Sequence, residues 1–229
     1  LFYDQKLIDL LNMAVGAQKY ADNDLKTNKY RKNGNANTVE FHMQKGVFKN
    51  SKKGESKYVY TNVFSNILIN YVWFKSNGEF QNILDKIFRD KAKIENDVWF
   101  LKMNDRTIKS SNRNNSILKE YKVKDEDGPI RYSFRASRYD YLRIAKAILD
   151  DWQNDTCVGK YLKTIREKRI PKNDKWKDDN THDLNSKSYA GKFHTNYAAM
   201  AKRNVMGMSG FGGQSIMIDF DKGRINVIN

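Results

Sequence analysis

The clearest pattern of apolar and polar positions lies between residues 64 and 88. Apolar residues recur there with helical spacing in two runs, and Ser76-Asn77-Gly78 separates the runs. The first run is Phe64, Ile67, Leu68, Tyr71 and Val72, and the second is Phe80, Ile83, Leu84, Ile87 and Phe88. Spacing of i, i+3, i+4 and i+7 gathers side chains on one helix face. The pattern predicts two helices joined by a glycine turn, and their apolar faces are expected to form a central part of the core.

Two weaker patterns predict further helices. Leu7–Met13 reads as a short amphipathic helix that ends near Gly16. Ser137-Arg138-Tyr139-Asp140 has the spacing of a capping box, with Asp in place of the usual Glu or Gln. The helix that it opens is expected to bury Leu142, Ala145, Ile148 and Leu149.

The end of the chain changes to a strand pattern. Ser215–Asp219 and Arg224–Ile228 read as two strands around the turn Asp221-Lys222-Gly223. Polar stretches at 17–57, 104–128 and 172–187 read as loops. Helices followed by strands predict an α/β (α+β) fold, with a helical part at about 1–170 and a sheet part at about 188–229.

Composition narrows the function classes. The chain has 229 residues, 39% of them hydrophobic, which is enough to bury a core, and no apolar run approaches the length of a membrane span. The net charge of +15 comes from cations spread along the whole chain. Because no nucleic-acid-binding module accompanies that charge, no nucleic-acid partner is expected.

Metal and disulfide chemistry find no support in the sequence. Cys157 is the only cysteine, and the three histidines are far apart with no ligand spacing. We therefore expect no metal site and no cofactor.

Three stretches contain groups that could perform chemistry. Tyr60-Thr61-Asn62 precedes a helix, so Asn62 is either a helix cap or a polar group that shares a site with the tyrosine. The glycine-rich run at 207–214 is either a bend before the terminal strands or a place where a backbone N–H faces a substrate oxygen. Ser116 and Lys119 would adjoin on a helix as a nucleophile and its base, but their surroundings are polar.

Four segments, taken in order, resemble the serine β-lactamase and penicillin-binding-protein superfamily, and in particular its β-lactamase-related esterase and amide-hydrolase branch. Residues 7–16 resemble the family's LRDLLNMTSG segment, and residues 54–62 resemble its GE-x-F-x-YSN segment. Residues 137–142 resemble its TARDLAR helix start, and residues 210–219 resemble its GHGGQ-x-I-x-ID strand.

The resemblance implies a fold and a chemistry. The fold would be an antiparallel sheet packed with helices, forming a single partial domain over 1–229. The reaction would be attack by a serine on an ester, amide or β-lactam bond of a small or peptide-like substrate, through an acyl-enzyme. Tyr60 would transfer the proton, with its pKa lowered or a lysine nearby. Asn62 would bind the substrate, with Phe211, Gly212 and Gly213 lining the site and the backbone N–H of Gln214 acting as an oxyanion donor.

The chain departs from the family pattern in two ways. Phe211 replaces the usual Lys or His, and the family's Ser-x-x-Lys motif would precede residue 1. The resemblance therefore implies a fragment truncated at both ends, whose nucleophile lies outside these residues, and the chain alone is expected to be inactive. The alternative is a non-catalytic module that binds a peptide, a cell-wall fragment or a protein partner. Relatives are often exported, which favours a periplasmic, cell-envelope or secreted location.

Overall fold

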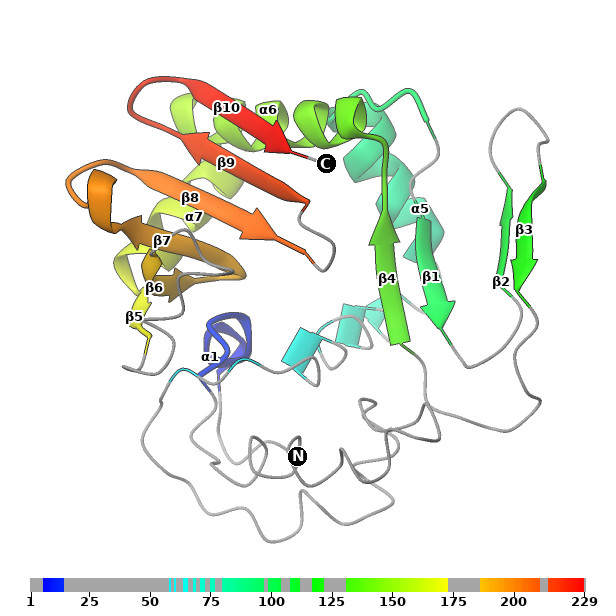
Figure 1. Ribbon diagram of the computed structural model, residues 1–229, viewed down its shortest axis with the longest axis horizontal. Helices are drawn as coiled ribbons and strands as arrows, with labels where there is room; N and C mark the ends of the chain where they lie inside the picture. Colours follow the sequence, from blue (N-terminus) through cyan, green and yellow to red (C-terminus); the bar gives the residue numbers. More distant parts are fainter. Residues whose placement is uncertain are drawn as a thin grey trace, which may run out of the picture.

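The fold combines helices with an antiparallel sheet (Figure 1), which confirms the expected mixed α+β class. The computed structural model describes residues 6–14, 58, 60, 64–65, 68, 71–72, 75–76, 80–96, 99–103, 108–111, 117–121, 131–172, 186–210 and 214–228. The helices are α1 (Leu7–Leu11), α5 (Phe80–Leu84), the π-helix η3 (Asp85–Lys91), α6 (Arg138–Gln153), α7 (Cys157–Glu167) and the 3₁₀-helix η4 (Ala198–Met200).

The main sheet has six strands in the order β10-β9-β8-β7-β6-β5, and all neighbours are antiparallel. Its strands are β5 (Ile170–Pro171), β6 (Ser186–Ala190), β7 (Phe193–Tyr197), β8 (Val205–Ser209), β9 (Ser215–Asp219) and β10 (Arg224–Ile228). Two separate ribbons pair β1 (Trp99–Met103) with β4 (Arg131–Arg135) and β2 (Ile108–Ser111) with β3 (Ile117–Tyr121).

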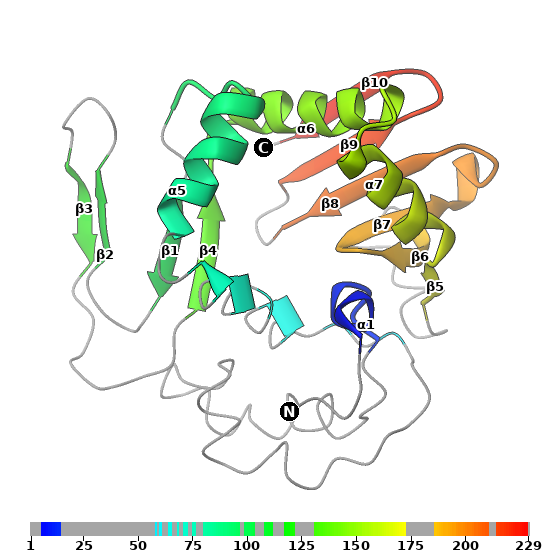
Figure 2. The same ribbon diagram turned by 180° about the vertical axis from the view of Figure 1, so that it is seen from behind.

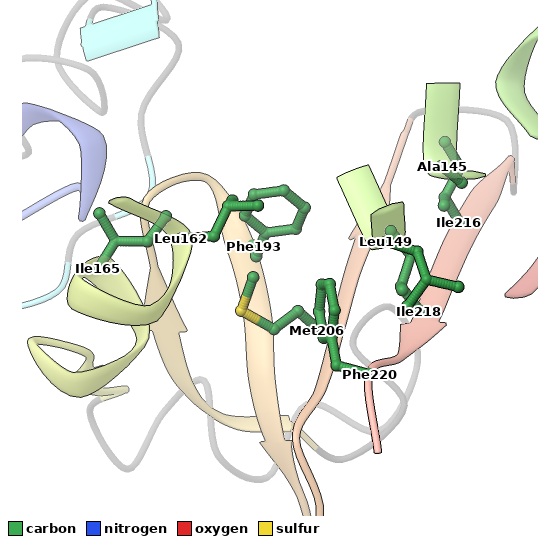
Figure 3. Close-up of a cluster of buried hydrophobic side chains, with 9 residues drawn as sticks. All are labelled: Ala145, Leu149, Leu162, Ile165, Phe193, Met206, Ile216, Ile218 and Phe220. Carbon is green, nitrogen blue, oxygen red and sulfur yellow. The ribbon is translucent and has the colours of Figure 1, made fainter. Parts of the chain in front are cut away.

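One hydrophobic core cluster of the described residues lies between this sheet and the helices α6 and α7, which cover the same face (Figure 2). Figure 3 shows the side chains that meet there: Ala145, Leu149, Leu162, Ile165, Phe193, Met206, Ile216, Ile218 and Phe220. Successive strand residues point to opposite faces. Since Val205 and Met206 are both buried, β8 is covered on both faces at its start.

The predicted cap of α6 is confirmed. The Ser137 hydroxyl accepts a hydrogen bond from the backbone N–H of Asp140 at 3.1 Å. The Asp140 carboxylate also reaches outside the helix and accepts bonds from the backbone N–H of Glu95 at 2.9 Å and the side-chain amide of Asn96 at 2.9 Å. Desolvation is the largest single effect on the pKa of Asp140 and raises it. The hydrogen bonds together outweigh desolvation, so the pKa of Asp140 lies below its usual value. Of the expected inner face of α6, Leu142 is exposed, whereas Ala145 and Leu149 are buried.

The central helical pair differs from its prediction. Residues 64, 65, 68, 71, 72 and 75 are helical, and Phe64 is buried, but Tyr71, Val72 and Ile87 are exposed. At Ile87 the reason is local. The π-helix η3 bonds the Ala92 N–H to the Ile87 carbonyl, five residues back, so the spacing of 3.6 residues per turn no longer sets which side chains face inward.

The remaining sequence expectations have mixed outcomes. Helix α1 is confirmed but ends at Leu11, before the expected end near Gly16. Strands β9 and β10 have the predicted bounds, and Gly223 in their turn has a φ of 60°. Stretch 104–128 was wrongly read as a loop throughout, because it contains β2 and β3. Those strands are paired across one ribbon, and their polar sequence lacks the alternation that marks a half-buried strand.

We expect Ile218→Ala to lower the free energy of unfolding by about 2–5 kcal/mol, because it leaves a cavity in the core beneath α6. Ile218 is 0% exposed, and Ile228 in the neighbouring strand is 52% exposed. Urea unfolding of both alanine variants provides the comparison, with Ile228→Ala as the matched control. Equal losses in the two variants would contradict this location of the core.

Candidate functional site

The turn between β6 and β7 is held against helix α1 by the buried side chain of Asn12. Its Oδ1 accepts a hydrogen bond from the Gly191 N–H at 2.6 Å, and its Nδ2 donates to the Lys168 carbonyl, just after α7, at 3.1 Å. The Lys192 N–H donates to the Leu11 carbonyl at 3.0 Å. Three parts of the chain that are distant in sequence therefore meet at this turn.

The backbone at the turn explains why the glycine is needed. Gly191 has a φ of 54° and Lys192 a φ of 77°, both in the left-handed region that favours glycine. A Cβ at Gly191 would also overlap the Ile165 side chain. Glycine is therefore required at position 191 both by the backbone conformation and by the close packing against α7.

The side chain of Lys192, the second residue of this turn, has a pKa well below its usual value. Its Nζ donates a hydrogen bond to the Ser65 hydroxyl at 2.9 Å. Desolvation lowers the pKa of the Lys192 ammonium from 10.5 to about 7, because burial disfavours the charged form. About half of the Lys192 side chains are therefore neutral at neutral pH, and a neutral amine can accept a proton.

A second polar cluster lies around the start of β6. The Lys172 Nζ donates to the Ser186 hydroxyl at 2.5 Å, and the His194 Nδ1 lies 3.5 Å from the same oxygen. Ser186 is 0% exposed and Lys172 is 1% exposed. Since no substrate reaches a hydroxyl closed off in this way, we assign these groups to the support of β5–β7.

Aromatic rings connect this cluster to the segment that contains Tyr60. The ring centroids of Tyr58 and Tyr189 lie 5.1 Å apart, and the Tyr189 and His194 rings meet edge to face, also at 5.1 Å. The Lys172 Nζ lies 6.0 Å from the centroid of the Tyr58 ring. The buried Tyr58 thus anchors the segment just before Tyr60 to β6 and β7.

Only part of the site predicted from sequence can be placed. Tyr60 is 44% exposed, so its hydroxyl-bearing side chain reaches solvent. Gln214 precedes β9, and its carbonyl accepts a hydrogen bond from the Gly210 N–H at 2.8 Å, which closes the connection from β8. Asn62, Phe211, Gly212 and Gly213 lie outside the described residues. The glycine-rich run begins inside β8, where Gly207 has no room for a Cβ beside the Tyr197 hydroxyl.

The helical pairing considered for Ser116 and Lys119 is wrong. Lys119 lies in strand β3 and not in a helix, and Ser116 lies outside the described residues. Cys157 is a free, exposed thiol at the start of α7.

Neither a metal cluster nor a membrane-spanning helix occurs in the described ranges. Those residues include no group of three or more His, Cys, Asp or Glu side chains arranged to hold a metal ion. Within the same part of the chain, every helix is too short or too polar to cross a bilayer.

Sequence patterns missed the contacts at the β6–β7 turn, because Ser65 and Lys192 are 127 residues apart and belong to no shared motif. The only local signal was Gly191 beside Lys192 between two strand-like stretches.

A scan against protein-family models and searches of curated proteins and solved structures found no match to this chain.

We expect Asn12→Ala to lower the free energy of unfolding by about 1–3 kcal/mol for each of the two backbone groups left unsatisfied. Asn12→Asp keeps the acceptor for Gly191 but buries a carboxylate oxygen against the Lys168 carbonyl, so its loss should be at least as large. Chemical denaturation measures both variants, with the exposed Asn226→Ala as the control. An Asn12→Ala variant with an unchanged free energy of unfolding would show that the turn keeps its position without this amide.

The lowered pKa of Lys192 predicts a pH-dependent stability. Between about pH 7 and 10.5 the unfolded chain binds a proton at this residue that the folded chain does not bind. Stability from this residue therefore rises with pH across that window. Lys192→Met removes the effect, so the variant should be more stable relative to the parent near pH 7, and the difference should shrink toward pH 10.5. Urea titrations at several pH values test this, and a constant difference would indicate an ordinary lysine.

Proposed function

We propose that this chain is part of a serine hydrolase of the β-lactamase and penicillin-binding-like superfamily. In this proposal it acts on an ester, amide or β-lactam bond through an acyl-enzyme, and its sheet and helices form a penicillin-binding-like fold. The supporting observation is the convergence at the β6–β7 turn. Lys192 contacts both the end of α1 and Ser65, which stands five positions after Tyr60.

The proposed tyrosine chemistry requires a base or a cation near the hydroxyl. A tyrosine hydroxyl with its ordinary pKa of about 10 holds its proton at neutral pH, so it needs a cation or a base nearby in order to transfer it. Lys192 brings an amine that titrates near neutrality to the helix that follows the tyrosine. Leu11, in the first segment that resembles the family, and Ser65, which follows the second, thereby both contact Lys192.

The roles of the remaining residues follow the resemblance. Tyr60 transfers the proton between nucleophile and leaving group. Asn62 binds the substrate amide or ester, and Phe211, Gly212 and Gly213 line the wall beside it. The backbone N–H of Gln214 stabilises the oxyanion, a donor type whose removal typically costs about 10²–10³ in rate.

We expect Tyr60→Phe to lower the hydrolysis of simple aryl esters by about 10²–10⁴-fold, the usual contribution of a positioned acid or base. The assay uses a chain that includes residues encoded upstream of Leu1, where the family would place Ser-x-x-Lys. Initial rates with an aryl ester and with a penicillin report the activity.

Tyr71→Phe is the matched control, because Tyr71 is 47% exposed and Tyr60 is 44% exposed. An unchanged rate in Tyr60→Phe would remove the role assigned to this tyrosine. Saturable binding of a peptide or cell-wall fragment with no turnover in any form of the chain would instead favour the non-catalytic module.

A further inference from the structure

Ser65 and Ser186 each form a hydrogen bond with a lysine amine, but they differ in access. Ser186 and its partner Lys172 are sealed from solvent, as described above. Ser65 and Lys192 are both partly exposed. The Ser65 residue is thus not sealed from solvent as Ser186 is, and the 2.9 Å separation places the Lys192 amine where it would receive the serine proton.

The Lys192 amine is held in position from the backbone side. The Lys192 N–H is bound to Leu11, and the Gly191 N–H is bound to Asn12, so the turn from which the side chain projects is fixed at two consecutive residues. Desolvation leaves a large fraction of the amine neutral near pH 7, with its lone pair free to accept a proton. A fixed base beside a reachable hydroxyl is the arrangement that activates a serine nucleophile.

We propose that Ser65 is a nucleophile for ester carbonyl groups and that Lys192 is its general base. This inference rests on the proposed acyl-transfer function for its substrate class. It differs from that proposal in two ways. It locates the nucleophile within this chain, on the helix that follows Tyr60, and not in a segment before residue 1. It also assigns to Lys192 the proton transfer that the proposed function assigns to Tyr60.

The steps balance with water as the only co-reactant. The neutral Lys192 amine takes the Ser65 proton while the serine oxygen forms a bond to the ester carbonyl carbon. The bond from that carbon to the alkoxy oxygen then breaks, and the Lys192 ammonium returns its proton to the leaving alcohol. A water molecule next attacks the acyl-serine carbon and gives its proton to Lys192. The bond to Ser65 breaks, the serine oxygen recovers the proton, and a carboxylic acid is released.

The test is covalent labelling of the 229-residue chain with an alkyl fluorophosphonate, followed by peptide mass mapping. In this reaction an oxygen–phosphorus bond forms and fluoride leaves. We expect one label, on Ser65, which Ser65→Ala abolishes and Ser116→Ala leaves unchanged. The labelling rate should rise with pH with a midpoint near 7, because only the neutral amine accepts the proton.

Two Lys192 variants separate catalysis from structural support. Lys192→Arg keeps a cationic hydrogen-bond donor for Ser65 but cannot accept a proton at neutral pH. It should therefore reduce the labelling rate by about 10²–10⁴-fold, as should Lys192→Met. Circular dichroism establishes that both variants are folded. A folded Lys192→Arg variant that labels at the parent rate would overturn the assignment of the base.

The remaining outcomes distinguish this inference from the proposed function. Labelling that persists in Ser65→Ala overturns the inference. No labelling of this chain, together with labelling at another serine in a chain extended upstream of Leu1, overturns the inference and leaves the proposed hydrolase standing. No labelling and no ester hydrolysis in either chain overturns both.

Discussion

The amide of Asn12 is the interaction on which the arrangement around the candidate site depends. One buried side chain satisfies a donor in the β6–β7 turn and an acceptor at the end of α7, while the neighbouring Leu11 carbonyl binds the next residue of the same turn. Each bond is modest, but a buried backbone group without a partner is costly, so the three parts must fit together at once. The position of the Lys192 amine is a consequence of this fit.

The kinds of side chain buried against the main sheet differ between the face beneath α6 and α7 and the end formed by β5–β7. The face beneath α6 and α7 is apolar, and its side chains form a buried cluster that stabilises the fold. Around β5–β7 polar and titratable side chains are buried beside apolar ones, including Lys172, Ser186 and His194. These groups are held by hydrogen bonds and by the rings of Tyr58 and Tyr189. Burial of the Lys192 amine at this end lowers its pKa to about 7.

Predictions from the sequence were accurate where the determining forces are local. The Ser137 cap and the terminal hairpin are set by residues within a few positions of one another, and both were confirmed with their bounds. The inner face of the second central helix was misjudged because η3 changes the hydrogen-bond step from four residues to five. The bond between Lys192 and Ser65 joins segments that no periodicity connects, so only the three-dimensional fold brings them together. At the candidate site, the roles of Tyr60 and Gln214 rest on the resemblance and stay predictions, whereas the Lys192 and Asn12 contacts had no counterpart in the sequence analysis.

The bond from Gly191 to Asn12 spans 179 residues of sequence, and this separation has a consequence for the order of folding. During synthesis the α1 segment is made long before the β6–β7 turn exists to receive it. At five residues, α1 is far too short to be stable alone as a helix in water. Helix α1 is therefore stabilised by contacts with strands that are synthesised late, and it cannot dock before they exist. The backbone contacts that hold the turn carrying Lys192 are likewise complete only once both ends of the chain have come together.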